Sequence, residues 1–238
     1  HINGAIPGMS GIDPHAFRSS LSSIVRRHNG EIWIASGSFG VIVLPPSGNA
    51  HVVNTESRSF VFDNYVNTLY AGRDGRVWVG QRSCASVTRR DGSGQRLVLR
   101  ENGRDFSNCD VRGLMEDRAG NIWLSTENEG IIRYRNGKSH QYKPTNHNYP
   151  VYDAINCYED SKGRLWAISR SGGLFLFDAS HDRFEPVNRR FHIEGTCAYA
   201  INEDRFGRLW VTTEGALVSL SFTDGSEMPE VVSFSKED

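Results

Sequence analysis

Residues 114–134, Leu-Met-Glu-Asp-Arg-Ala-Gly-Asn-Ile-Trp-Leu-Ser-Thr-Glu-Asn-Glu-Gly-Ile-Ile-Arg-Tyr, decide the fold of this chain. Apolar residues alternate along the stretch, and many are β-branched, which predicts three short strands. Two polar segments, 117–120 and 128–130, separate these strands. Asp and Asn bond their own backbone and Gly accepts positive φ, so both segments are expected to be tight turns.

The same unit recurs along the chain at a nearly constant period. All five tryptophans lie in it, at intervals of 45, 45, 43 and 44 residues: Trp33, Trp78, Trp123, Trp166 and Trp210. A glycine lies three residues before each of them: Gly30, Gly75, Gly120, Gly163 and Gly207. Such a period, with several short strands in each repeat, is typical of a β-propeller.

We therefore predict an all-β fold, a β-propeller of four-stranded antiparallel blades. Each unit is apolar on both faces, so its neighbours must cover it, and one Trp per unit is expected to pack between blades as a structural residue. The blades are expected within 21–238, at about 21–53, 66–100, 111–142, 154–186 and 198–234. Residues 1–20 are expected to be the tail of an earlier blade or a closing strand. A closed five-bladed ring and part of a larger, seven-bladed array both stay open.

Composition excludes several classes of partner. The net charge of −1 gives no overall field that attracts nucleic acid or an anionic membrane. No apolar run approaches the ~20 residues of a membrane-spanning helix. The chain begins with His and shows no signal peptide, so we interpret it as a processed or excised segment.

The four cysteines lack metal-binding spacing, and no cofactor is expected. A Cys84–Cys109 disulfide is geometrically conceivable, whereas Cys157 is expected to be a buried thiol.

Candidate ligand-binding residues lie on the loops between second and third strands and on the loops between blades, which share one face of a propeller. They are Arg82, Asn128, Arg170, His147, Tyr149, His192 and Glu194. The two arginines suit a carboxylate or sulfate, and Tyr149 suits a sugar face. His192, Glu194 and His147 are the nearest approach to a catalytic or metal cluster, but we predict no catalytic residue and no metal site. For each residue an ordinary solvated loop position is the alternative.

The repeat resembles the two-component regulator propeller repeat. The resemblance rests on Glu-Asp, two variable residues, Gly, a variable residue, Ile or Leu and Trp, as in 116–123, 159–166 and 203–210. The first and second repeats depart from it, with Arg26-Arg27 and Ala71-Gly72 in place of the acids. The repeated Asp residues, Asp117, Asp160 and Asp204, are expected to brace the turn before Gly, because a catalytic pair should occur once.

The resemblance implies a function. Such repeats form the periplasmic sensor regions of bacterial hybrid two-component histidine kinases, which sense carbohydrates. The chain is thus expected to be a periplasmic, non-enzymatic, oligosaccharide-binding segment whose kinase lies elsewhere, with a homodimer allowed through the parent sensor. Two alternatives stay open: a propeller lyase or glycan-cleaving enzyme, and a scaffold that docks protein.

Overall fold

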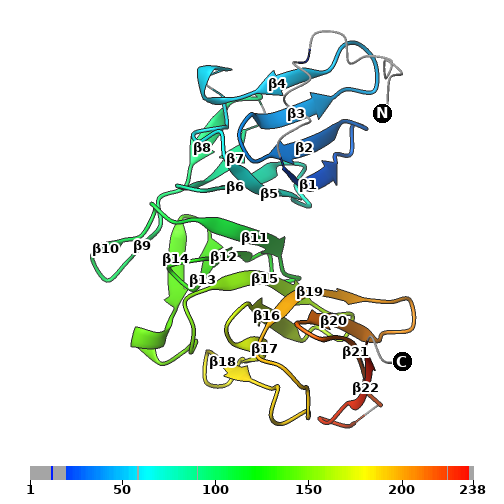
Figure 1. The fold of residues 1–238 in the computed structure, drawn as a ribbon. Helices are drawn as coiled ribbons and strands as arrows, with labels where there is room; N and C mark the ends of the chain where they lie inside the picture. Colours follow the sequence, from blue (N-terminus) through cyan, green and yellow to red (C-terminus); the bar gives the residue numbers. More distant parts are fainter. Residues whose placement is uncertain (1–11, 13–19, 58, 90, 224, 236–238) are drawn as a thin grey trace. The chain divides into compact units, whose positions relative to one another are not determined.

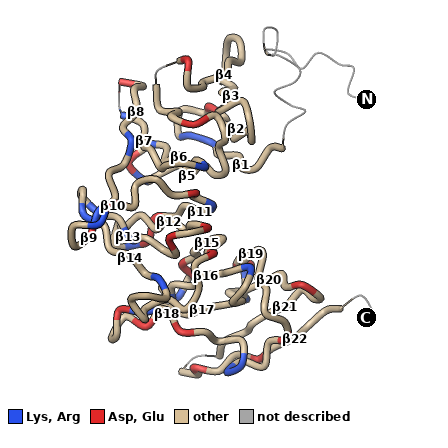
Figure 2. Tube along the Cα trace, turned by 60° about the vertical axis from the view of Figure 1, so that its left-hand side comes forward, with Lys and Arg blue, Asp and Glu red and all other residues tan. Residues whose placement is uncertain are grey.

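The computed structural model describes residues 12, 20–57, 59–89, 91–223 and 225–235 (Figure 1). These residues contain β-strands and two 3₁₀ turns, η2 (Thr55–Ser57) and η3 (Pro144–Asn146). Most of 1–20 lies outside the described residues, and so does the role predicted for it. In the described part, no helix is long and apolar enough to cross a membrane. Figure 2 shows acidic and basic residues interspersed along the chain, in keeping with the net charge of −1.

The described strands form five antiparallel four-stranded sheets, here called blades one to five, each in the order of its strands along the chain. Blade one is β1 (Leu21–Arg26), β2 (Ile32–Ser36), β3 (Gly40–Leu44) and β4 (His51–Val53); blade two is β5 (Val66–Ala71), β6 (Val77–Gln81), β7 (Ala85–Thr88) and β8 (Gly94–Arg96); blade three is β11 (Val111–Glu116), β12 (Ile122–Thr126), β13 (Ile131–Arg135) and β14 (Lys138–Tyr142); blade four is β15 (Ala154–Glu159), β16 (Leu165–Ser169), β17 (Gly173–Asp178) and β18 (Arg183–Pro186); blade five is β19 (Ala198–Glu203), β20 (Leu209–Thr213), β21 (Ala216–Ser221) and β22 (Glu230–Ser235). The predicted all-β architecture is confirmed.

The chain divides into two compact units, residues 1–114 and 115–238, with the boundary inside β11. In unit one, apolar residues of blades one and two form one core, in which Trp33, Phe60 and Val79 are buried. In unit two, blades four and five share a core around Trp166 and Phe191. Stacked sheets therefore bury each other's faces, as the repeat pattern predicts.

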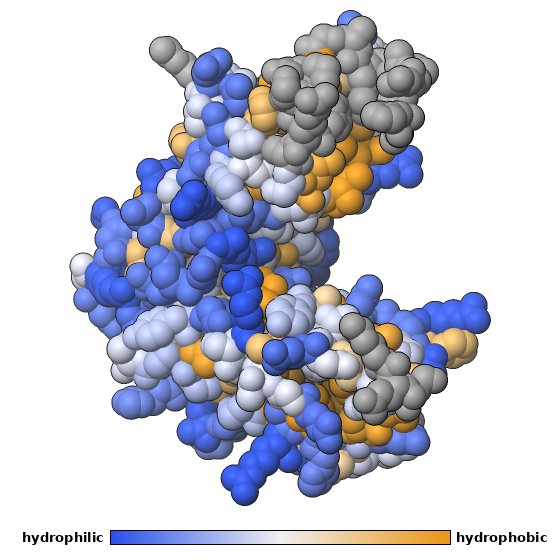
Figure 3. Space-filling view, viewed as in Figure 1, coloured by the Kyte–Doolittle hydropathy of each residue, from blue (hydrophilic) through white to orange (hydrophobic). Residues whose placement is uncertain are grey.

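Four of the five tryptophans are at most 6% exposed. Aromatic rings of the following blade cover two of them: Phe177 lies 5.5 Å from Trp123, and Phe222 lies 5.9 Å from Trp166, between ring centroids. Trp210 is different, because it is partly exposed and stacks on Phe234 of its own outer strand β22. Blade five is the last described blade, and apolar surface gathers around β22 (Figure 3). Trp210 is thus less buried than the repeat pattern predicts.

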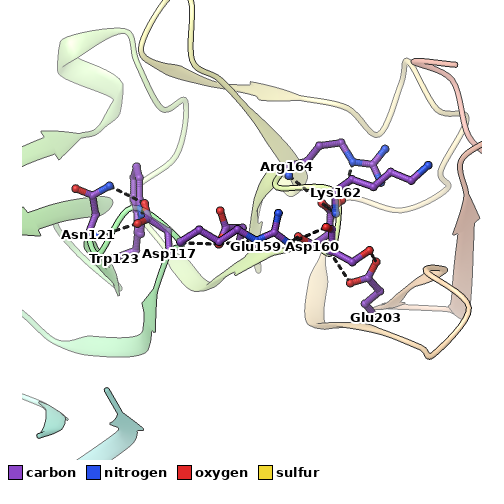
Figure 4. A network of polar contacts seen from close by, with 10 residues as sticks. Asp117, Asn121, Trp123, Glu159, Asp160, Lys162, Arg164 and Glu203 are labelled. Atoms are coloured by element: carbon purple, nitrogen blue, oxygen red, sulfur yellow. Dashed lines mark hydrogen bonds and ion pairs between the residues drawn. The ribbon is translucent and has the colours of Figure 1, made fainter. Parts of the chain in front are cut away.

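The Asp of the Glu-Asp pair braces the turn between first and second strands, as predicted (Figure 4). Asp160 Oδ1 accepts from the backbone N–H of Lys162 (3.0 Å) and Arg164 (2.8 Å). Its Oδ2 accepts from Arg164 Nε (2.6 Å) and from the indole of Trp166 (3.0 Å). One buried carboxylate therefore fixes the turn, the arginine after the Gly and the Trp that anchors the core.

The Glu of the pair contacts the preceding blade. Glu159 accepts from the backbone N–H of Arg118 (2.8 Å), and Glu203 accepts from that of Ser161 (2.7 Å). The Arg118 guanidinium in turn donates to the carbonyls of Asp160 and Ser161. The sequence Glu-Asp thus serves one turn within its blade and one in the blade before it, so its recurrence is explained without acid–base chemistry.

Blade one reverses the charges of this arrangement. Arg27 stands where the Asp stands in the later repeats, and Glu31 stands after the Gly. Glu31 Oε2 accepts from both Arg27 (2.7 Å) and the Trp33 indole (3.0 Å). These bonds lower the pKa of Glu31 although burial opposes the shift. The first repeat therefore lacks the Asp but keeps both interactions of the later repeats, an ion pair across the turn and a carboxylate that accepts from the Trp indole.

Blade two differs from the prediction at its outer edge. Its fourth strand β8 ends at Arg96, whereas the blade was predicted to extend to residue 100. The chain then forms a separate hairpin, β9 (Arg100–Glu101) with β10 (Arg104–Asp105). Its turn is Asn102-Gly103, and both residues have positive φ. Asn-Gly between two short strands is the strongest short-range signal of a hairpin, so the sequence itself indicates this turn.

The disulfide between Cys84 and Cys109 that the sequence left open is absent: both residues are buried thiols. Burial raises the pKa of Cys84 and raises that of Cys157 to about 12. The prediction that Cys157 is a buried thiol is confirmed.

Candidate ligand-binding site

A polar residue three positions after each Trp fixes the loop that follows the second strand. These residues are Ser36, Gln81, Thr126, Ser169 and Thr213. In four blades a hydroxyl accepts the backbone N–H three residues later, for example Thr126 from Glu129 (2.9 Å) and Ser169 from Gly172 (3.0 Å). This small local bond closes a tight loop between the second and third strands. In these four blades the loop between the second and third strands is therefore held by a bond of its own.

Blade two breaks the rule, because Gln81 replaces the hydroxyl. Its side chain is fully buried, and its Oε1 accepts from the backbone N–H of Phe62 (2.7 Å) and Asp63 (2.8 Å) on the loop before β5. Its Nε2 donates to Ser86 Oγ, which donates to Phe60 O. A longer side chain at this one position thus holds the loop between blades one and two instead of its own loop.

Two exposed aromatic residues and one arginine stand on the elements held by Gln81; we call Phe62, Tyr65 and Arg82 the platform. Phe62 is 43% exposed and Tyr65 is 38% exposed. The Arg82 guanidinium lies over the Tyr65 ring, 5.5 Å from its centroid. The backbone N–H of Arg82 donates to the backbone carbonyl of Tyr65 (3.0 Å). An exposed aromatic face beside a guanidinium can receive a sugar ring and a polar substituent together.

Two charged residues, Asp63 and Arg96, form hydrogen bonds with the backbone of the loops that carry the platform. Asp63 Oδ1 accepts from Tyr65 N (2.9 Å), and an Arg96 nitrogen donates to Ser83 O (3.2 Å). Burial is the main cause of the raised pKa of Cys84, which lies behind this loop, while Arg96 lowers it and Asp63 raises it. The site therefore holds two guanidinium groups and one carboxylate on fixed backbone.

A second cluster lies on the corresponding loops of unit two. Arg170 follows β16, Glu214 follows β20, and Cys197 and Tyr199 stand at the start of β19. Cys197 Sγ lies 3.8 Å from Glu214 Oε2, and Tyr199 is 45% exposed. Cys197 is the main cause of the raised pKa of Tyr199; Glu214 adds to it and Arg170 opposes it. Four groups from three chain segments thus lie within electrostatic reach.

A β-bulge sets the direction of Tyr199. The pairing of β19 with β20 shifts between Ala198 and Ala200, and the first strands of blades one, two and four shift at the matching place. In blades one and two the bulged residue is polar and bonds to the next first strand: Ser22 donates to Val66 O, and Asn67 donates to Val111 O. In blade five an aromatic residue takes this place and is exposed.

The structure does not bring the predicted site residues together in one place. Arg82 belongs to the platform and Arg170 to the second cluster. Asn128 is exposed on the loop between β12 and β13. His147, His192 and Glu194 are exposed, but in the described residues no hydrogen bond or ion pair joins them to each other. The described part likewise contains no group of three His, Cys, Asp or Glu side chains arranged for a metal ion.

The prediction for Tyr149 is wrong. Its side chain is fully buried and packs against Phe175 (5.0 Å) and Phe184 (5.6 Å) between ring centroids. Burial raises the pKa of its hydroxyl well above the usual value. It therefore presents no ring face to a sugar. The exposed tyrosines on loops between blades, or directly after them, are Tyr65, Tyr152 and Tyr199.

Sequence reasoning missed Phe62, Tyr65 and Tyr199. For Phe62 and Tyr65 the sequence held one signal, Gln81. Three residues after the Trp, the other four repeats have Ser or Thr, and only this repeat has Gln. A residue that departs from a structural repeat at a buried place must have a partner that the other repeats lack, and here that partner is the loop carrying Phe62 and Tyr65.

Residues 61–82 and 105–128 match the model of the two-component regulator propeller. These two segments of the chain are similar to the repeat of that family. The first matched segment contains the whole platform. No characterised protein matches the chain by sequence comparison.

Solved structures share the fold. The extracellular domain of the hybrid two-component system BT3049 from B. thetaiotaomicron has a TM-score of 0.76 and 19% identity over 92% of this chain, which spans 28% of that domain. That of BT4673 has a TM-score of 0.75 and 17% identity over 91% of this chain and 31% of that one. Virginiamycin B lyase from Staphylococcus aureus has a TM-score of 0.70 and 17% identity over 91% of this chain and 70% of that one. These likenesses establish a propeller fold.

Proposed function

We propose that this chain is part of the extracytoplasmic, ligand-sensing region of a two-component sensor, that it binds a carbohydrate on its loop face, and that a histidine kinase outside this chain receives the signal. The observation that carries the proposal is the platform. Two exposed aromatic side chains stand on a loop that a fully buried glutamine holds in place. Carbohydrate rings bind through their apolar faces to such aromatic surfaces, and a fixed loop lowers the ordering cost of binding.

The comparisons support the sensor part of the proposal. The matched repeat is that of a two-component regulator, and two structural neighbours are extracellular domains of hybrid two-component systems. The acidic residues that recur in the repeat hold turns, so they offer no pair for hydrolysis of a glycosidic bond. Support for the carbohydrate comes from the platform alone.

Elimination chemistry is the second candidate, because virginiamycin B lyase has the same fold. Its residues here would be His192 and Glu194, which are exposed on the loop between blades four and five. No contact in the described residues brings them together, which makes lyase activity the weaker proposal.

The test is a thermal-shift and calorimetric screen of the purified protein against neutral and acidic oligosaccharides, with and without divalent metal. A glycan at a hundredfold excess over its dissociation constant should stabilise the protein by about 2.7 kcal/mol. Tyr65→Ala should weaken binding at least about tenfold, a loss of about 1.4 kcal/mol. Tyr152→Ala is the matched control, since Tyr152 is also an exposed tyrosine, at 45%, but stands on the loop between blades three and four. Absence of glycan binding, or metal-dependent turnover, would overturn the proposal.

A further inference from the structure

Arg82 differs from the arginines that pack on the repeat's tryptophans. In each blade an arginine lies over the Trp, at 5.1 to 5.7 Å from the ring centroid: Arg27, Arg76, Arg133, Arg164 and Arg208. Each of these also forms an ion pair, with Glu31, Asp74, Asp182, Asp160 and Asp204 respectively. Arg82 lies over Tyr65 in the same way, but within the described residues its guanidinium has no carboxylate partner.

The charges around Arg82 leave an excess of positive charge. Asp63 is an acidic residue on the loop that carries Tyr65, and its Oδ1 already accepts from Tyr65 N. Arg96 brings a second guanidinium to the neighbouring Ser83 carbonyl. A guanidinium stacked on an aromatic ring keeps the N–H groups at its edge available, in a geometry that fits a planar oxyanion with two parallel bonds.

From these observations we infer that the carbohydrate bound at the platform carries an oxyanion, a carboxylate or a sulfate ester, which pairs with Arg82 while the sugar ring lies on the platform's aromatic side chains. The inference rests on the proposed function, since it names the ligand class of that site. The sugar ring supplies the apolar contact, and the oxyanion takes the place that a carboxylate side chain takes beside the other stacked arginines.

The experiment compares oligogalacturonate, a galactan oligosaccharide of the same length and a sulfated galactan of that length, by calorimetry on the whole protein. We expect an acidic oligosaccharide to bind at least tenfold more tightly than the neutral one. Arg82→Gln should remove that advantage, so that the acidic and the neutral oligosaccharide bind this variant within about twofold of each other. Raising the salt concentration should weaken binding of the acidic ligand in the native protein and have little effect in Arg82→Gln.

Arg205→Gln is the matched control. Arg205 also lies over an exposed aromatic ring, that of Phe206 at 4.7 Å, but on the turn between β19 and β20. It should change neither affinity. Preference for oligogalacturonate assigns the oxyanion to a carboxylate, and preference for the sulfated galactan assigns it to a sulfate; both support the inference if Arg82→Gln abolishes them.

Two results would overturn the inference, and they are distinguishable. Neutral binding that equals acidic binding and is unaffected by Arg82→Gln would refute the oxyanion and leave the carbohydrate proposal standing. Binding of linear polyphosphate through Arg82 as tightly as either acidic glycan would show unspecific charge attraction. If no oligosaccharide binds at all, the proposed function itself fails.

Discussion

Trp166→Ala should destabilise the protein by about 3–5 kcal/mol in urea-induced unfolding. The Trp166 side chain is fully buried in the core shared by blades four and five, and its ring lies against Phe191 and Phe222. Truncation removes this contact between blades and also the indole donor to Asp160. The midpoint of unfolding, with an unchanged dependence on urea concentration, measures the loss.

Trp210→Ala is the matched control for this substitution. Trp210 stands at the same place of the next repeat and makes the same indole bond, to Asp204 (3.0 Å), but it is partly exposed. Its replacement should cost less than half as much. Equal losses at the two positions would contradict the claim that burial between neighbouring blades, rather than the repeat's internal bonds, gives the Trp its energetic weight.

Asp160→Ala should cost about 3–5 kcal/mol, the range for removing one partner of a buried ion pair. The change leaves four donors of one turn without their acceptor: the backbone N–H groups of Lys162 and Arg164, the Arg164 side chain and the Trp166 indole. Thermal or urea unfolding of the variant gives the magnitude, and circular dichroism shows whether the strands persist.

Asp204→Ala is the control, because Asp204 makes the equivalent four bonds in blade five. Those bonds, led by that from the Trp210 indole, hold the pKa of Asp204 well below its usual range. Its contribution is therefore present above the ordinary Asp pKa and is lost as the pH falls below it. Because this turn is more exposed, the loss should be smaller than for Asp160. A larger loss at Asp204 would contradict the role given to burial.

The repeated features of the sequence predicted the fold well, for a physical reason. A Trp, a Gly and an Asp that recur together must serve the same local structure each time, and Asp160 and Asp204 do so bond for bond. The charge reversal at Arg27 and Glu31 was visible only as a departure, because its compensation depends on the ion pair that the folded turn brings together.

The binding face was less predictable, because loops do not repeat. Tyr149 reads as a polar loop tyrosine, yet its loop folds back and buries it against Phe175. Tyr65 reads as the residue before a strand, and its exposure depends on Gln81, which lies sixteen positions later in the sequence. Arg82 was predicted from its loop position, but its lack of an acidic partner required the fold.

The most direct test of the account is hydrogen–deuterium exchange of the protein with and without a saturating acidic oligosaccharide, oligogalacturonate or the sulfated galactan. We expect slower exchange in the backbone of 60–65 and 81–85, with no change in the turns at 117–120, 160–163 and 204–207. Unchanged exchange in 60–65 and 81–85, with protection elsewhere or nowhere, would contradict the platform as the place where this protein meets its ligand.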